Sequence, residues 1–179
     1  ARSRSNPRAT ATPEAAEPEA AEPKEAEPKE AERESTDMSL RILIAVDGSA
    51  YSLRAVQHVL RLRDAGCAIE PHLLNVQIPL ESGHVRMFIA RESIESYYRD
   101  EGLAALKEAT AALEAAGQPC STHIAVGHLG QTIARYADEM KFQLIVIGSH
   151  GRTGLKHAVM GSVATEVLKL ASVPVTVVK

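Results

Sequence analysis

Short runs of consecutive apolar residues divide the chain from Arg41 onwards. The clearest runs are residues 42–46, which stop at an Asp-Gly-Ser turn, and residues 144–147. A strand that is covered by helices on both faces has no polar side, so each run predicts a fully buried strand. Three further strands are predicted where polar residues alternate with apolar ones or interrupt them, at residues 69–76, 121–126 and 173–178.

Between the strands, apolar residues recur every three or four positions, which predicts helices. One such helix follows the first strand and ends at Gly66, and residues 77–90 form a long connection after the second strand. A helix of about 24 residues then runs up to the stop signals Gly117 and Pro119. The predicted buried faces of the four helices are Leu53, Val56, Val59 and Leu60; Ile94, Tyr98, Ala105, Leu106, Ala109 and Leu113; Leu129, Ile133, Ala137 and Met140; and Val163, Val167 and Leu170.

Strands that alternate with helices predict an α/β, Rossmann-like domain with an open, mostly parallel sheet and helices on both faces. In such a sheet, ligands bind beyond the carboxyl ends of the strands, at the point where the winding direction reverses. We therefore expect the functional residues in the loops that follow the first, second and fourth strands.

Residues 1–37 have a different composition, dominated by Ala, Pro and Glu. The sequence Glu-Pro-Lys-Glu-Ala occurs twice in this segment, which has ten acidic residues against six basic ones. Such a segment cannot bury enough apolar surface to offset the conformational entropy that ordering costs, so we expect a disordered tail. Residues 38–179 have the usual size of a single domain.

Charge and composition disfavour several classes of function. The tail has a net charge of −4 and the whole chain has a net charge of −3, so the domain itself is near neutral. Nucleic-acid binding needs clustered Lys and Arg, often with aromatic side chains, and this chain has no Trp and two Phe. Cys67 and Cys120 are far apart and lack neighbouring ligand residues, which argues against a zinc site or a redox dithiol. The sequence shows no apolar run that could span a bilayer and no apolar stretch typical of a secretory leader, so we expect a cytoplasmic protein.

The most informative motif follows the fourth strand. The sequence reads Gly-Ser-His-Gly-Arg-Thr-Gly at residues 148–154, and Gly161 and Ser162 then open the last helix. Glycines after a buried strand let the main chain approach a phosphate closely, and the amino end of a helix adds free N–H groups and a positive dipole. Arg152 and Lys156 can add charge-assisted hydrogen bonds. The Gly-Lys-[Ser/Thr] sequence of P-loop NTPases is absent, so the motif predicts a phosphate site of another kind.

Four segments carry a resemblance to a known family: Ile42 to Ser49, Leu74 to Val76, Gly148 to Ser162 and Pro174 to Val178. Together they resemble the universal stress protein family over residues 38–179. The resemblance implies a five-stranded parallel sheet in the order 3-2-1-4-5, and the glycine spacing is similar to that of the family's ATP-binding branch. It therefore implies ATP, ADP or AMP as ligand, with Mg²⁺ carried on the phosphates.

The resemblance also implies roles for individual residues. Asp47, Gly48 and Ser49 would meet the nucleotide at the end of the first strand, and the main chain of Val76 would contact adenine. The ribose and phosphates would be held by Gly148, Gly151, Gly161 and Ser162. The predicted nucleotide site also includes Ser149, His150, Arg152 and Val163. Members of the family usually pair through the last strand, which makes that strand the expected homodimer edge, formed by Val175, Thr176, Val177 and Val178.

Some of these residues have simpler explanations. Asp47 is about as well explained by a turn or a helix cap as by ligand contact, and its place at the predicted crevice favours contact. A lone surface histidine such as His150 is more often passive than functional. Tyr97 and Tyr98 are better explained by core packing than by a stacking platform.

The function that the sequence predicts is nucleotide binding in a regulatory or stress-response protein with an unidentified protein partner. No obvious catalytic group accompanies the motif, so at most slow ATP hydrolysis is expected. Two alternatives remain open. One is a homodimeric interaction module without nucleotide, and the other is an adenylating enzyme similar to the ATP pyrophosphatases, for which the loop after the first strand has too few Ser and Gly residues.

Overall fold

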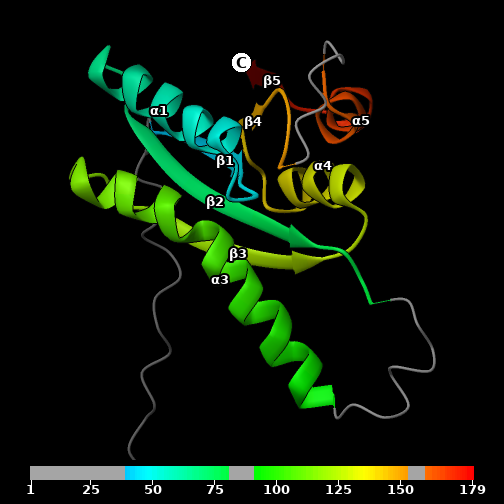
Figure 1. The fold of residues 1–179 in the computed structure, drawn as a ribbon. Coiled ribbons are helices and arrows are strands. Elements are labelled where there is room, and N and C mark those ends of the chain that lie inside the picture. Colours follow the sequence, from blue (N-terminus) through cyan, green and yellow to red (C-terminus); the bar gives the residue numbers. More distant parts are fainter. Residues whose placement is uncertain (1–38, 81–90, 153–159) are drawn as a thin grey trace, which may run out of the picture. The chain divides into compact units, whose positions relative to one another are not determined.

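A computed structural model describes residues 39–80, 91–152 and 160–179 of the chain. The predictions for the tail at residues 1–37, for most of the 77–90 connection and for Lys156 lie outside the described residues. The described strands are β1 (Leu40–Ala45), β2 (Ile69–Gln77), β3 (Ser121–Val126), β4 (Leu144–Gly148) and β5 (Val175–Val178). The described helices are α1 (Ala50–Asp64), α3 (Arg91–Ala115), α4 (Leu129–Glu139) and α5 (Ser162–Leu170) (Figure 1).

The strands form one sheet in the order β3-β2-β1-β4-β5, and all of its neighbouring strands are parallel. Both the predicted fold class and the predicted strand order are thus confirmed. The order reverses at β1, which lies between β2 and β4, so the chain winds away from β1 in both directions. This reversal opens a crevice at the carboxyl ends of β1 and β4.

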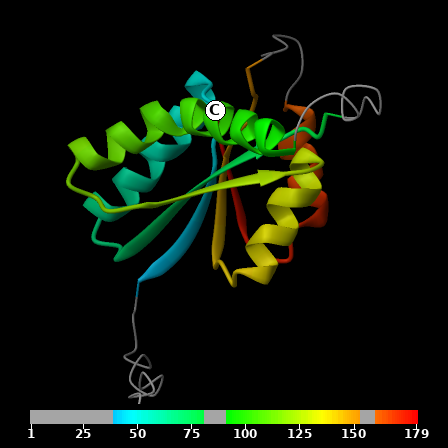
Figure 2. The same cartoon turned by 90° about the horizontal axis from the view of Figure 1, so that it is seen from below.

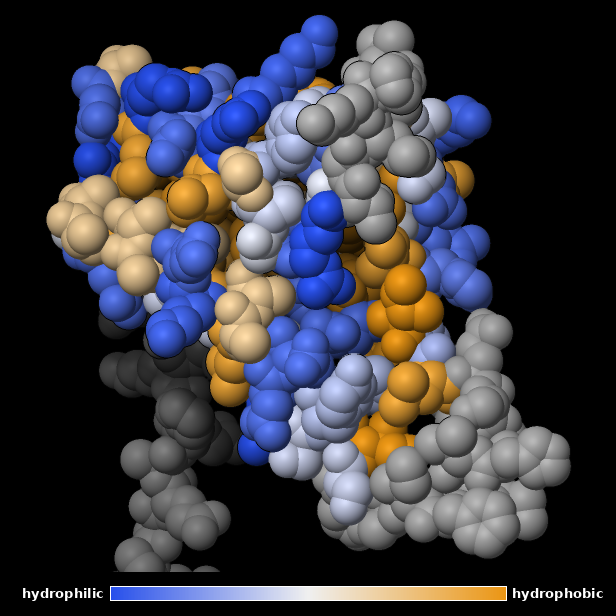
Figure 3. Space-filling model, in the orientation of Figure 1, coloured by the Kyte–Doolittle hydropathy of each residue, from blue (hydrophilic) through white to orange (hydrophobic). Residues whose placement is uncertain are grey.

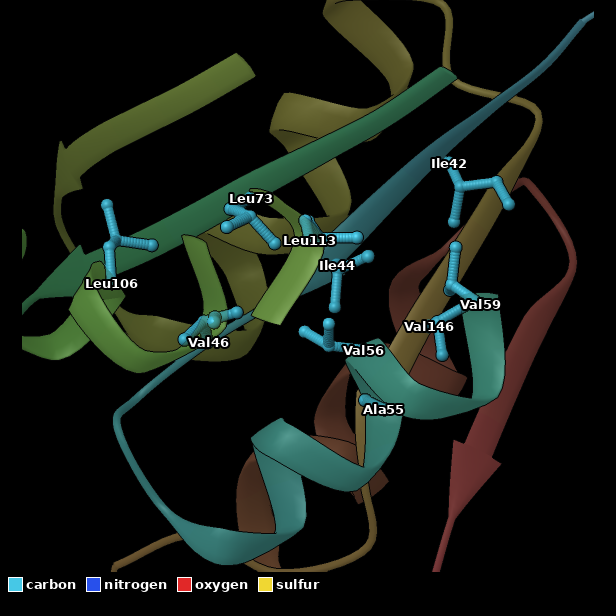
Figure 4. Packing of buried hydrophobic residues seen from close by; sticks show 11 residues of the cluster. Ile42, Ile44, Val46, Ala55, Val56, Val59, Leu73, Leu106, Leu113 and Val146 are labelled. Carbon is cyan, nitrogen blue, oxygen red and sulfur yellow. The ribbon is translucent and has the colours of Figure 1, made fainter. Parts of the chain in front are cut away.

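Helices cover both faces of the sheet, with α1 and α3 on one face and α4 and α5 on the other (Figure 2). Side chains of β1 alternate between the two faces. Ile42, Ile44 and Val46 pack with α1 and α3 (Figure 4), whereas Leu43 and Ala45 pack with α4 and α5. This alternation of apolar side chains explains why the β1 sequence has no polar residue after Arg41.

Helix ends account for the differences from the predicted faces. Met140 and Leu170 were expected to face the core, but they are 42% and 48% exposed. Met140 follows the last residue of α4, and Leu170 is the last residue of α5. The chain turns back towards the sheet at both places, so these two side chains extend past the packed surface. The last strand begins at Val175, two residues later than predicted.

In the part of the chain that the structure describes, none of the helices is long and apolar enough to cross a membrane.

Candidate functional site

A cavity of about 560 Å³ lies at the carboxyl ends of the strands. Among the residues that the structure describes, its lining includes every one that was predicted to contact the nucleotide except Gly48 and Ser49. The chain segments that form it include the ends of β1, β2 and β4 and the amino end of α5, and α1, α3 and α4 contribute further residues. The cavity therefore occupies the position that the reversal in strand order creates.

Gly48 and Ser49 do not line the cavity but shape the turn beside it. Gly48 has a φ angle of 78°, which side chains with a Cβ atom rarely adopt. The Ser49 hydroxyl accepts a hydrogen bond from the Ser52 N–H at 3.2 Å and so caps the amino end of α1. Both residues are explained by this strand-to-helix turn.

Asp47 connects the end of β1 to the glycine-rich loop. Its Oδ1 accepts a hydrogen bond from the Ser49 N–H at 3.0 Å, which forms a local turn. Its Oδ2 accepts one from the main-chain N–H of Arg152, also at 3.0 Å. Asp47 thus has the turn role that was its simpler explanation, and it also lies in the wall of the cavity.

Three glycines of the motif that the structure describes lie where a side chain would have little or no room. A Cβ atom on Gly148 would be 2.8 Å from the carbonyl carbon of Tyr51 in α1. On Gly151 it would be 2.8 Å from the Asp47 carboxylate, and on Gly161 it would be 3.2 Å from the carbonyl oxygen of Ser149. The glycines let the loop, β1 and α1 approach one another, so tight packing explains part of the glycine spacing.

Several main-chain donors of the loop are bonded within the protein. The Ser149 N–H donates to the Val178 carbonyl at 2.7 Å, and the Gly161 N–H donates to the Ser149 carbonyl at the same distance. With the Arg152 bond to Asp47, these interactions hold both ends of the loop in place. These bonds occupy three of the main-chain donors near the predicted anion site, and the adjoining helix presents further donors.

The amino end of α5 supplies those donors. The first bond of the helical pattern runs from the Thr165 N–H to the Gly161 carbonyl at 3.0 Å. The N–H groups of Ser162, Val163 and Ala164 come before it, so the helix itself contains no acceptor for them. All three residues line the cavity. The positive end of the helix dipole therefore lies at the cavity wall.

His150 and Arg152 complete this side of the cavity. The Nδ1 atom of His150 is 3.1 Å from the Ser149 hydroxyl, and its ring lies 5.2 Å from that of Tyr51. The side chain of Arg152 is exposed. We call the segments 148–152 and 161–164 the glycine-rich end of the cavity.

The other end is formed largely by apolar side chains. Val76, Ile78, Leu80 and Tyr97 line the cavity on the side of β2, and we call them the apolar end. Of these, only Val76 was predicted to contact a ligand. Asn75 also lines the cavity; it is buried, and its Nδ2 donates to the Val46 carbonyl at 2.8 Å. Asn75 is a polar residue directly after the apolar pair Leu73 and Leu74 near the carboxyl end of β2, and this is the signal that could have identified it.

The prediction that both tyrosines pack in the core is correct for Tyr98 and wrong for Tyr97. Tyr98 is 9% exposed, and its hydroxyl accepts a hydrogen bond from the Leu80 N–H at 2.7 Å. Tyr97 is 49% exposed and lines the cavity. Consecutive residues of a helix point about 100° apart, so two adjacent side chains cannot share one narrow buried face.

A pair of histidines joins β2 to β3: His72 is buried and His123 is half-buried. His72 Nδ1 is 2.9 Å from His123 Nε2, and His72 Nε2 is 2.8 Å from a Glu70 carboxylate oxygen. Burial lowers the pKa of His123, and the neighbouring His72 and Arg41 lower this pKa further. This chain of hydrogen bonds joins β2 to β3.

Among the residues that the structure describes, no three His, Cys, Asp or Glu side chains are arranged to hold a metal ion.

Comparison with known proteins identifies the family of this chain. The sequence profile of the universal stress protein family matches residues 38–179. The chain belongs to the universal stress protein family. It is 31% identical over 156 residues to universal stress protein MJ0531 of Methanocaldococcus jannaschii, an alignment that covers 82% of this chain and 86% of that protein.

Solved structures of the family share the fold of this universal stress protein. The structure of MJ0577, also from M. jannaschii, superposes with a TM-score of 0.67 at 30% identity and covers 79% of this chain and 96% of that one. Two more distant structures contain nucleotides. A universal stress protein in complex with cAMP has a TM-score of 0.60 at 24% identity, covering 79% of this chain and 98% of that one. An Arabidopsis thaliana family member with AMP bound has a TM-score of 0.56 at 19% identity, covering 78% and 91%.

Proposed function

We propose that this universal stress protein binds an adenine nucleotide, with ATP as the first candidate, in the cavity at the carboxyl ends of the strands. The observation that carries the proposal is the pairing of two unlike walls. One wall presents the first N–H groups of α5, and the other presents apolar side chains from the end of β2. Phosphates suit the first wall and a flat base suits the second.

Relatives that contain nucleotides support the choice of ligand class. Family members with this fold have been solved with cAMP and with AMP. The cavity volume of about 560 Å³ lies in the range of ordinary small-molecule and cofactor sites. The Asp47 carboxylate already accepts two main-chain hydrogen bonds. A Mg²⁺ ion that accompanied ATP would therefore be held mainly by the phosphates.

The role that we propose is regulatory. Nucleotide binding would stabilise the glycine-rich loop and the start of α5, and so change the surface that a protein partner meets. Any ATP hydrolysis would be slow, because the described part of the cavity contains one carboxylate and that group is bonded to the loop.

Calorimetric titration with ATP, ADP, AMP and cAMP tests the binding proposal, together with native mass spectrometry of gently purified protein. We expect saturable binding of one nucleotide per subunit and a higher melting temperature with ATP and Mg²⁺. Absence of binding and of any thermal shift at millimolar ATP would favour the nucleotide-free interaction module. Release of AMP and pyrophosphate with candidate substrates would instead favour the adenylating enzyme.

We also propose that the protein forms a homodimer through β5. This strand pairs with β4 on one side only and lies at the edge of the sheet, with four half-buried residues at 175–178. An exposed edge of this kind tends to pair with another strand. We expect a dimer in sedimentation equilibrium and a shift towards monomer for Thr176→Lys. A monomeric wild type would contradict this assignment.

A further inference from the structure

The apolar end contains an aromatic ring that packs little against the protein. Tyr97 lines the cavity, yet 49% of its surface is exposed. Its ring centroid lies 5.8 Å from that of Tyr98, and the two ring planes are inclined by 58°. The neighbouring Tyr98 is buried and bonded to the chain after β2. Tyr98 thus anchors this turn of α3 and leaves Tyr97 on the cavity side.

Two further apolar side chains accompany Tyr97. Ile78 is 62% exposed although it lines the cavity, and Leu80 is held at the cavity wall by the hydrogen bond from its N–H to Tyr98. Hydrophobic surface reaches the solvent beside the carboxyl end of β2 (Figure 3). Large apolar side chains that remain partly exposed beside a concave site are typical of ligand contacts.

We propose that Tyr97 stacks against the base of the bound nucleotide and is a main determinant of the preference for a ligand with a flat aromatic base. This inference rests on the proposed nucleotide binding and deepens it. Tyr97 has no more than two side-chain torsions to fix on binding, so closing over a base costs little conformational entropy. Its ring also offers a stacking face to any base, whereas Ile78 and Leu80 contribute only apolar contact.

Binding of ATP and of inorganic tripolyphosphate by the wild type and Tyr97→Ala separates the two ends of the cavity. Tripolyphosphate has the phosphate chain and no base. We expect Tyr97→Ala to weaken ATP binding roughly tenfold, the order of effect found when one base-stacking side chain is removed. Tripolyphosphate binding should stay within about twofold of the wild type, because the glycine-rich end is unchanged.

Leu103→Ala is the matched control, because Leu103 is on the same helix, is 50% exposed and does not line the cavity. Tyr97→Phe keeps the ring and should keep ATP affinity within about twofold. The chain has no Trp and four Tyr, so tyrosine fluorescence provides a second measurement. Stacking on adenine should change the emission of the wild type, and most of that change should be absent in Tyr97→Phe although this variant still binds ATP.

Three results would overturn the inference in distinguishable ways. If the wild type binds no ATP, the proposed function and the inference both fail. If the wild type binds ATP and Tyr97→Ala binds it equally tightly, the inference alone fails. A parallel loss of ATP and tripolyphosphate binding in Tyr97→Ala would also contradict it, because such a loss would mean that Tyr97 supports the cavity as a whole.

Discussion

The two ends of the cavity are built in different ways. At the glycine-rich end, main-chain groups form the proposed phosphate contacts. The loop is held by the bonds Ser149 N–H to Val178 and Arg152 N–H to Asp47, and α5 presents its first N–H groups. At the apolar end, the wall consists of side chains such as Ile78 and Tyr97, which come from β2 and α3.

This difference determines how each end should respond to mutation. A main-chain site depends on the absence of side chains, so even one added methyl group changes it. A site made of side chains loses affinity in proportion to the contact area that is removed. We therefore expect steep effects at the glycine-rich end and graded effects at the apolar end.

The largest expected effect is that of Gly161→Val on nucleotide affinity. A Cβ atom here would lie 3.2 Å from the Ser149 carbonyl oxygen, which is a tight contact, and the two methyl groups of valine add further bulk between the loop and the start of α5. Losing charge-assisted hydrogen bonds, each of which contributes roughly 1.5–3 kcal/mol, should weaken ATP binding about a hundredfold. Ile78→Ala, at the other end, should weaken it only about fivefold.

Isothermal titration of both variants measures this contrast. Ala111→Val on the exposed side of α3 is the control for added side-chain volume. Equal losses for Gly161→Val and Ile78→Ala would remove the distinction between the two ends, and undiminished binding by Gly161→Val would contradict the assigned phosphate site.

Asn75→Leu should have the next largest effect, on stability. Asn75 is 3% exposed and supports the apolar end by donating to the Val46 carbonyl. Leucine would leave that buried acceptor unpaired, which we expect to lower the free energy of unfolding by about 2 kcal/mol. Urea denaturation measures the change. Gln77 is less buried, and Gln77→Ala removes its hydrogen bond to Asn75. This variant should lower the free energy of unfolding clearly less, and an equal decrease would argue against this account.

Asp47→Asn should have a smaller effect at the glycine-rich end. The variant keeps the Oδ1 acceptor for Ser49 but places an amide donor opposite the Arg152 N–H. We expect a loss of about 1 kcal/mol in the free energy of unfolding, and weaker ATP binding because the loop is no longer tethered. Asp64→Asn, at an exposed residue of α1, is the control. A variant with unchanged stability and affinity would show that the tether is dispensable.

The smallest effect concerns pH. The pKa of His123 is lowered in the folded protein from the ordinary value of 6.5, by burial and by its neighbours His72 and Arg41. Below pH 6.5, His123 therefore binds a proton more readily in the unfolded chain than in the folded protein. The stability of the fold should therefore decline as the pH falls below about 6.5.

His123→Gln tests this pH dependence. We expect urea unfolding to show a smaller difference in stability between pH 7.5 and pH 5.5 for this variant than for the wild type. The groups that face the histidine pair are Glu70, Arg41 and the Tyr136 ring. His58→Gln, on α1, should leave the difference as it is in the wild type, and an equal change in both variants would contradict the role of His123.

Prediction from sequence succeeded where neighbours along the chain carry the information. The run at residues 42–46 identified β1, and the alternation at residues 121–126 matched the bounds of β3. The described part of the glycine-rich loop, residues 148–152, lines the cavity. The faces of the helices were less accurate at their ends, where Met140 and Leu170 extend past the sheet.

Sequence prediction failed where two elements distant in the chain meet. Tyr97 was assigned to the core because aromatic residues favour burial, and only the packing of α3 against the end of β2 shows which of the two tyrosines is buried. The position of the loop likewise depends on β5, because the Val178 carbonyl accepts a hydrogen bond from the Ser149 N–H.

By itself, the sequence determined the order of the elements, the parallel sheet and the glycine-rich end of the cavity. These follow from periodicity and from the conformational freedom of glycine, which act over a few neighbouring residues. Only the tertiary structure decided the composition of the apolar end and the pairing of His72 with His123. The physical reason is that these contacts join different elements, and their partners are chosen by how helices and strands pack in three dimensions.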